Sequence, residues 1–313
     1  MPACPHPPDR ARVRFAARDY VTGDDFQVAD CGACGLAVTL PTPADLGRYY
    51  PAAYYGAAGE RRFPAPVEWL QGKLYGSRAE TVERLAGSPG RVLDVGCGPG
   101  RLLEAFRRRG WEVQGTELGE DAARAARAKG IPVHVGPLEA AGIADGSLDA
   151  VTMWHVLEHW PDPAVALAHA ARLLRPGGVL MVGVPNFGSP EARATRDGWF
   201  HLDVPRHLAH LDPAALSRLL GEAGVRPVRW SFLAPEFDVF SFVQSAENAL
   251  GLPRNLLYSR LRSAGARLGS AGALATAAAF VLAAPLGVLA VPATAILSAL
   301  GRGSSVTALA VKG

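Results

Sequence analysis

The sequence predicts an α/β protein built on a doubly wound, largely parallel sheet. From Val67 to about Val184, short apolar runs alternate with amphipathic stretches: RVLDV precedes RLLEAFRRRG, WEVQGTEL precedes EDAARAARAKG, and LDAVTMW precedes PAVALAHAARLLRPGG. Strands that alternate with helices of this size form βαβ units, and their helices cover both faces of the sheet. A glycine-rich turn between the first strand and its helix supports the same architecture.

Composition narrows the class of protein. The chain has 313 residues, and its hydrophobic share of 49% is enough to bury a large core, which excludes disorder. Its net charge of +3 comes from 32 basic and 29 acidic residues, so we expect no nucleic-acid partner. The first fifteen residues contain no apolar core of a secretory signal, so we expect a cytoplasmic protein with reduced cysteines.

The strongest motif is VLDVGCGPGRLL at residues 92–103. Its glycines are spaced G-x-G-x-G at 96, 98 and 100, and Asp94 lies in the strand just before them. This pattern fits a nucleoside ligand without a pyrophosphate better than a dinucleotide. Glu117 ends the next predicted strand, where a carboxylate can accept hydrogen bonds from both ribose hydroxyls. The alternative is a glycine-rich turn without a ligand.

From about Val67 to Leu220 the chain resembles a class I S-adenosylmethionine-dependent methyltransferase, of the group with "vLEH" and "RLLRPGG" segments. Both segments are present, at residues 156–159 and 172–178. The resemblance implies a seven-stranded Rossmann-like sheet with an antiparallel last strand. We therefore divide the chain into a cysteine module at 1–60, the methyltransferase domain at 61–240, an apolar helical insertion at 241–303 and the last strand at 304–313.

The resemblance also assigns the cofactor site. It places the methionine part of S-adenosylmethionine on Asp94 and the glycine loop, the ribose on Glu117 and the adenine on Leu118. A further adenine contact falls to Glu139 or to the backbone of Leu138, and the end of the fourth strand lines the methyl-transfer face. The predicted cofactor residues are Asp94, Gly96, Cys97, Gly98, Gly100, Glu117, Leu118, Leu138, Glu139, Met153 and Trp154.

A base is required only where the acceptor must lose a proton, and histidine suits that role at neutral pH. We predict His155 and His207 as the catalytic residues. The segment that resembles the family's active-site cover supplies the predicted substrate contacts Trp199, His201, Asp203 and Arg206. His159 is interpreted first as a structural partner of Glu158 or a helix cap. The His and Asp spacings match no known metal-ligand pattern.

A second cluster involves cysteine. Cys31 and Cys34 form a C-x-x-C-G knuckle, which commonly supplies two of four zinc ligands. We predict Cys4 and His6 as the other two, with a metal-free relic as the alternative. The segment resembles the zinc-ribbon-like leader of some sugar and cell-surface-glycan methyltransferases.

Residues 271–300 carry no charge, a length sufficient to span a bilayer. A single crossing would separate the last strand from its sheet, so we expect a hairpin of two helices that contacts the inner face of the membrane. A buried helix pair or a dimer contact is the alternative.

Together these patterns and the resemblance predict methyl transfer from S-adenosylmethionine to a small or lipid-linked acceptor. The preferred acceptor is a hydroxyl on a sugar or a related cell-envelope intermediate. A quinone or polyketide-like acceptor is one alternative. The other is a non-catalytic cofactor-binding module, which predicts a collapsed pocket around His207.

Overall fold

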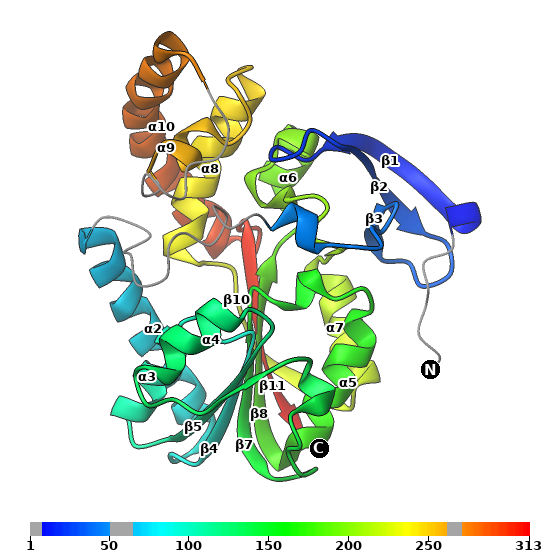
Figure 1. Ribbon diagram of the computed structural model, residues 1–313, viewed down its shortest axis with the longest axis vertical. Helices are drawn as coiled ribbons and strands as arrows, with labels where there is room; N and C mark the ends of the chain where they lie inside the picture. Colours follow the sequence, from blue (N-terminus) through cyan, green and yellow to red (C-terminus); the bar gives the residue numbers. More distant parts are fainter. Residues whose placement is uncertain (1–7, 51–64, 262–270) are drawn as a thin grey trace.

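Figure 1 shows a computed structural model of the protein, which describes residues 8–50, 65–261 and 271–313. Its centre is a seven-stranded sheet in the order β10-β11-β8-β7-β4-β5-β6. The strands are β4 (Arg91–Val95), β5 (Glu112–Glu117), β6 (Val133–Val135), β7 (Leu148–Trp154), β8 (Leu174–Pro185), β10 (Val225–Ser231) and β11 (Ser305–Lys312). Strand β11 runs antiparallel to both of its neighbours, and the pairs among the other strands are parallel. The predicted fold class is therefore confirmed.

Helices cover both faces of this sheet (Figure 1). One face carries α2 (Ala65–Ala86), α3 (Arg101–Arg108) and α4 (Glu120–Arg127), and the other carries α5 (Pro163–Leu173) and α7 (Pro213–Glu222). Asp212 caps the start of α7, because its carboxylate accepts the N–H of Ala215 at 2.8 Å. Asp162 caps α5 in the same way. The two helices start where the sequence places a capping carboxylate before a proline.

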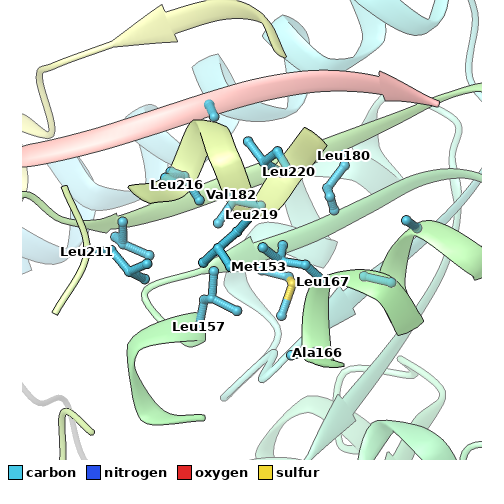
Figure 2. Close-up of a cluster of buried hydrophobic side chains, with 14 of the residues drawn as sticks. Met153, Leu157, Ala166, Leu167, Leu180, Val182, Leu211, Leu216, Leu219 and Leu220 are labelled. Atoms are coloured by element: carbon cyan, nitrogen blue, oxygen red, sulfur yellow. The ribbon is translucent and has the colours of Figure 1, made fainter. Parts of the chain in front are cut away.

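The core under α5 and α7 is apolar and closely packed. Figure 2 shows Met153 of β7 among leucines of β8, α5 and α7, and its side chain has no exposed surface. Side chains on a strand alternate between faces, so Met153 points into this core while Thr152 and Trp154 point to the opposite face. This alternation decides which side chains at the carboxyl end of β7 are buried in this core and which are not.

A second sheet of four strands lies over the carboxyl edge of the first sheet (Figure 1). Its strand order is β1-β2-β3-β9. The strands are β1 (Ala11–Arg18), β2 (Asp25–Cys31), β3 (Ala37–Leu40) and β9 (Ala209–His210). The predicted N-terminal module is thus a β structure, and β9 joins it from a segment far along the chain. The hydroxyl of Thr39 also donates to the carbonyl of His207 at 2.7 Å. The leader therefore packs directly on the histidine-containing segment.

Between β10 and β11 the chain forms α8 (Pro235–Ala249), α9 (Leu256–Leu261) and α10 (Ala273–Ala299). The two-helix hairpin expected at 271–300 is instead the single helix α10, which continues through Pro285 and Pro292. Both prolines lie on its exposed side, while its other side packs against α8 and α9 and holds the helix together. Helix α10 is long and apolar enough to cross a membrane, by length and composition.

The helical insertion, which in the structure is the whole segment between β10 and β11, is fixed to the sheet by a buried carboxylate. Glu191, in α6 (Pro190–Thr195), accepts hydrogen bonds from Ser241 at 2.5 Å, from Ser245 at 2.8 Å and from Ser304. Burial raises the pKa of Glu191. Because two of the serines belong to α8 and Ser304 directly precedes β11, one side chain ties both ends of the insertion to the fold.

Short 3-10 helices complete the described chain. They are Pro8–Arg10, Gly47–Tyr49, Leu138–Ala140, Leu157–His159, Arg196–Gly198 and Phe200–Leu202.

Candidate active site

The glycine loop joins β4 to α3 at the carboxyl edge of the sheet. Gly96 and Gly98 have φ values of 67° and 52°, which side-chain-bearing residues rarely adopt. A Cβ on Gly96 would lie 2.4 Å from Cγ2 of Val156, so no larger residue fits there. A Cβ on Gly98 would meet no atom within 4 Å. The loop therefore leaves open space above Gly98, as a ligand cradle requires.

Two carboxylates flank this cradle. Asp94 is buried and accepts a hydrogen bond from the Thr152 hydroxyl at 2.5 Å, and burial raises its pKa to about 7. Glu117, at the end of β5, accepts the N–H of Gly98 at 2.9 Å and that of Gly119 at 2.8 Å. Both acids thus lie where the sequence placed them, and Glu117 also holds the loop in shape.

The residues predicted to contact the adenine differ in how far their side chains are exposed. Leu118 is 74% exposed beside the cradle, so its side chain is available to a flat ring. Glu139 is turned away, with its carboxylate 3.5 Å from Nδ1 of His169 on α5. Leu138 and Cys97 have buried side chains, and burial raises the pKa of the Cys97 thiol. Leu138 and Cys97 can therefore offer a ligand only their backbone, whereas the Glu139 side chain is half exposed and the adenine contact assigned to it stays a prediction.

The face predicted for methyl transfer lies at the end of β7. Met153 itself was predicted to line this face, but its side chain lies in the core described above. Trp154 packs against Gly183, and the guanidinium of Arg78 lies 3.7 Å from the centre of its ring. His155 comes next with a φ of 51°, a backbone conformation that turns the chain sharply at the end of β7.

This turn brings four histidines and one glutamate together. Nδ1 of His155 lies 3.4 Å from Oε1 of Glu158, and Nε2 of His207 lies 4.0 Å from the same oxygen. The rings of His155 and His201 stack with centres 6.2 Å apart, and those of His159 and His207 meet edge to face at 4.8 Å. Thus both histidines predicted to be catalytic lie beside one carboxylate.

Burial and charge act in opposite directions within this cluster. Burial favours the protonated form of Glu158, but His155, His207 and His159 outweigh it and lower the pKa of Glu158 to about 2. Burial lowers the pKa of His201 to about 3 and that of His207 to about 4. At neutral pH the cluster therefore presents the Glu158 carboxylate beside the neutral imidazoles of His201 and His207.

Two predicted substrate contacts lie elsewhere. Arg206 has no exposed side-chain surface: its guanidinium contacts Asp19 at 2.6 Å, Asp203 at 2.7 Å and the carbonyl of Tyr49 at 2.9 Å. It links the leader to the 200–210 segment and cannot clamp a substrate. Trp199 is 2% exposed and belongs to the core beneath the leader. His201 and Asp203 do line the cavity.

The cluster opens into a cavity of about 690 Å³. One end is polar, with His155, Glu158, His159, His201, Asp203 and His207; the other is walled by apolar side chains of α8, α9 and α10, including Phe240, Val243, Leu257, Tyr258, Phe280 and Ala283. Phe237 joins the two ends, with its ring 4.5 Å from that of His155. The cavity is open at His207, which contradicts the collapsed pocket expected of a non-catalytic module.

Several lining residues could not be identified from the sequence. The VLEH segment contains Glu158, but its sequence context indicates only a partner of His159. Phe237 and Tyr258 reach the cavity from the insertion, and Tyr20 reaches it from the leader. Only the tertiary arrangement of these three segments brings them to one site.

The predicted zinc ligands cannot be assembled from the described residues. Cys4 and His6 lie outside the described residues. Cys31 is buried at the end of β2, and Cys34 is half-buried in the turn after it. The zinc site stays a prediction.

Comparison with known proteins agrees with this geometry. A family profile described as a methyltransferase domain matches residues 69–229, just over half of the 313 residues. An uncharacterized 37.1 kDa protein in transposon TN4556 of Streptomyces fradiae is 33% identical over 199 residues, 59% of this chain and 56% of that protein. A ubiquinone biosynthesis O-methyltransferase of Xanthomonas oryzae is 40% identical over 109 residues, 33% of this chain and 45% of that protein. The chain thus spans about half the length of the curated relatives it matches.

Among solved structures, an S-adenosylmethionine-dependent methyltransferase from Archaeoglobus fulgidus has a TM-score of 0.50 at 19% identity, covering 86% of this chain and 100% of that one. A putative sarcosine dimethylglycine methyltransferase from Galdieria sulphuraria has a TM-score of 0.50 at 15% identity, covering 85% and 97%. These likenesses concern the fold.

Proposed function

The chain belongs to the methyltransferase domain family, and from this premise we propose that it transfers a methyl group from S-adenosylmethionine to a hydroxyl of an amphiphilic acceptor. One observation carries the proposal. The same cavity has a histidine and carboxylate cluster at the edge of the sheet and an apolar chamber between the insertion helices. A molecule with a polar head and an apolar tail matches both ends.

The cradle fits the cofactor. The open space above Gly98, the buried Asp94 carboxylate and the exposed Leu118 side chain suit its methionine, amino and adenine parts in turn. Glu117 is available to the ribose at the end of β5. When bound, S-adenosylmethionine supplies a methyl group activated by its sulfonium charge. The work left to the protein is alignment and the exclusion of water.

His155 is the residue that we assign to the acceptor's proton. Its Nδ1 faces the Glu158 carboxylate at 3.4 Å, and its Nε2 is buried with no hydrogen-bond partner among the described residues. The negative charge of Glu158 beside Nδ1 stabilises the ring once Nε2 has accepted a proton. As the acceptor oxygen gains a methyl group, Nε2 of His155 takes the hydroxyl proton. His207 lies across the same carboxylate and orients the polar head.

The head is best matched by an aromatic ring. Phe237 stands against His155 at the junction of the two ends of the cavity, where it can stack on a flat head group. The Xanthomonas relative is a ubiquinone biosynthesis O-methyltransferase, which supports the same choice. A lipid-linked sugar is the second candidate, and the resemblance of the cysteine leader favours it.

The apolar end connects with the surface of α10. Leu274, Val281 and Val288 are 86%, 71% and 74% exposed, and no charged residue interrupts the helix. Water makes such a surface costly, whereas the acyl region of a membrane accepts it. We propose that α10 lies on the inner membrane face, so that an acceptor tail can pass from the bilayer into the cavity. A contact between two copies of the chain is the alternative.

The test is transfer of labelled methyl from S-adenosylmethionine into an extract of the native cell, followed by organic and aqueous partition. A Gly96→Asp variant serves as the blank, because a side chain there collides with Val156. Label in the organic phase supports the amphiphilic acceptor. Label confined to the aqueous phase would contradict the apolar tail, and no label above the blank would contradict the transferase proposal.

A further inference from the structure

Three side chains at the polar end of the cavity converge on one point. Glu158, His159 and His207 each offer one ligand atom, and these three atoms lie within 4.8 Å of one another. We infer that they form a site for a divalent metal ion of the zinc class, bound by two imidazoles and one carboxylate. The inference concerns residues that no spacing pattern links, since His207 lies 48 positions after His159 in the sequence.

The two imidazoles are already oriented for this task. Nδ1 of His159 lies 2.9 Å from the carbonyl oxygen of Arg206, and Nδ1 of His207 lies 2.8 Å from that of His201. A carbonyl only accepts, so each Nδ1 carries the proton and donates it. Metal-binding histidines characteristically donate one ring N–H to a carbonyl or carboxylate in this way, which fixes the other nitrogen toward the ion. Both Nε2 atoms are therefore in the form that a metal requires.

The carboxylate supplies an independent observation. Glu158 is 2% exposed, and neither of its oxygens has a hydrogen-bond partner within the part of the chain that the structure describes. A buried carboxylate without hydrogen bonds is costly unless a cation compensates it. The contacts of Oε1 with His155 at 3.4 Å and with His207 at 4.0 Å are too long to replace such bonds. A metal ion would satisfy both oxygens of Glu158.

The distances allow an ion after a small contraction. Because no two of these atoms are more than 4.8 Å apart, one point lies within about 2.8 Å of all three. Zinc bonds to nitrogen and oxygen are about 2.0–2.2 Å long, so a ligand atom needs to move by no more than roughly 0.7 Å. Rotation of three side chains about their own bonds suffices for a movement of this size.

Three protein ligands leave a coordination position open, as in catalytic zinc sites. All three residues line the cavity, so the open position faces the space proposed for the acceptor head. A hydroxyl oxygen bound there loses its proton more readily, because the ion stabilises the negative charge. This role rests on the proposed function. The binding of the ion does not.

The experiment measures metal binding directly. Full-length protein carrying Cys31→Ser and Cys34→Ser, which disables the predicted cysteine site, is stripped with a chelator and titrated with Zn²⁺ by calorimetry and with Co²⁺ by visible absorption. We expect one ion per chain, with a Co²⁺ spectrum of nitrogen and oxygen ligands and no thiolate charge-transfer band. The absence of a bound ion would overturn the inference, and so would a thiolate band.

Variants locate the ion. Glu158→Gln and His207→Gln keep the shape of the cavity and should each weaken Zn²⁺ binding at least tenfold, whereas His169→Gln on α5 should leave it unchanged. Equal affinity in Glu158→Gln and the parent protein would overturn the assignment. A circular dichroism spectrum and melting curve for each variant show that it is folded. His159→Gln provides a third test of the ligand set should one of the other variants fail to fold.

Methyl transfer is measured on the same samples, so that the two proposals are separated. Label transferred at full rate by protein that binds no Zn²⁺ would overturn the metal site and leave the proposed function standing. Zn²⁺ bound by protein that transfers no label would support the metal site and count against the proposed function.

Discussion

Arg206 provides the sharpest test of the structure against the sequence, because the two assign it different roles. As a substrate contact it would matter for turnover alone. In the structure its side chain is fully buried, and its guanidinium compensates Asp19, which is equally buried, and Asp203. Burial favours the protonated form of Asp203, but Arg206 outweighs it and the pKa of Asp203 is lowered to about 2. Replacement by methionine keeps most of the volume and leaves two carboxylates without their cation.

The magnitude follows from the cost of uncompensated buried charge. Breaking a buried ion pair by removing one partner destabilises a protein by about 3–5 kcal/mol. At roughly 2–4 °C per kcal/mol for larger domains, the Tm of Arg206→Met should fall on the order of 10 °C. Combining it with Asp19→Asn should recover part of the loss. Arg12→Ala removes an ion pair whose arginine is 87% exposed, and it should leave the Tm unchanged.

The pH dependence has a definite sign. Without Arg206, burial of Asp203 should raise the pKa of its carboxyl in the folded state. A raised carboxyl pKa means that the folded state binds the proton more tightly, so the variant recovers stability as the pH falls. Urea unfolding between pH 8 and pH 5 should show the deficit shrinking. If Arg206→Met unfolds at the same urea concentration as the parent protein and loses only turnover, the structural role of Arg206 would be refuted and a substrate contact would be favoured.

Three further predictions concern the cofactor and the membrane. Glu117→Ala should weaken S-adenosylmethionine binding, since two charge-assisted hydrogen bonds are worth about 1.5–3 kcal/mol each at most, and unchanged calorimetric affinity would contradict the ribose assignment. Because burial raises the pKa of Asp94 to about 7, its carboxylate forms as the pH rises, and affinity for the cofactor's ammonium group should increase between pH 6 and pH 8. Asp94→Asn should abolish that increase. A flat profile in the parent protein would count against the assignment of Asp94 to the ammonium group. Replacing Val281 and Val288 by Asp should release the protein from lipid vesicles in a flotation assay, whereas Val165→Asp, on α5, should not; retention of the double variant would argue that α10 contacts protein rather than lipid.

The sheet could be predicted because each of its signals is local. The glycine loop requires backbone angles that few residues adopt, Asp212 and Pro213 begin a helix by their own chemistry, and alternating apolar runs define strands one by one. The helical insertion was predicted in composition but not in form. Prolines normally interrupt a helix, yet α10 continues through Pro285 and Pro292 because α8 and α9 support its opposite side.

The cavity proposed for the acceptor could be predicted only in part, because its lining residues are distant in sequence. Residue type and family pattern pointed to His155 and His207, which both line it, but not to the carboxylate between them, since nothing local marks Glu158 as buried. Arg206 illustrates the opposite error. An arginine in an active-site segment favours substrate contact, and the acid that captures it, Asp19, lies 187 positions earlier.

The cradle and the cavity differ in how far apart their residues lie in the sequence. The seven-stranded sheet supplies the cradle, and it does so with residues that are close in sequence. The cavity proposed for the acceptor instead takes Tyr20 from the leader and Phe237 from the insertion, with the histidine cluster between them. Buried polar groups hold both additions in place: Arg206 fixes the leader, and Glu191 fixes the insertion. The choice of acceptor should therefore change with the additions, while cofactor binding remains a property of the sheet. A change of the insertion alone, with the loop and Glu117 kept, should alter which molecule is methylated and leave the affinity for S-adenosylmethionine as it was.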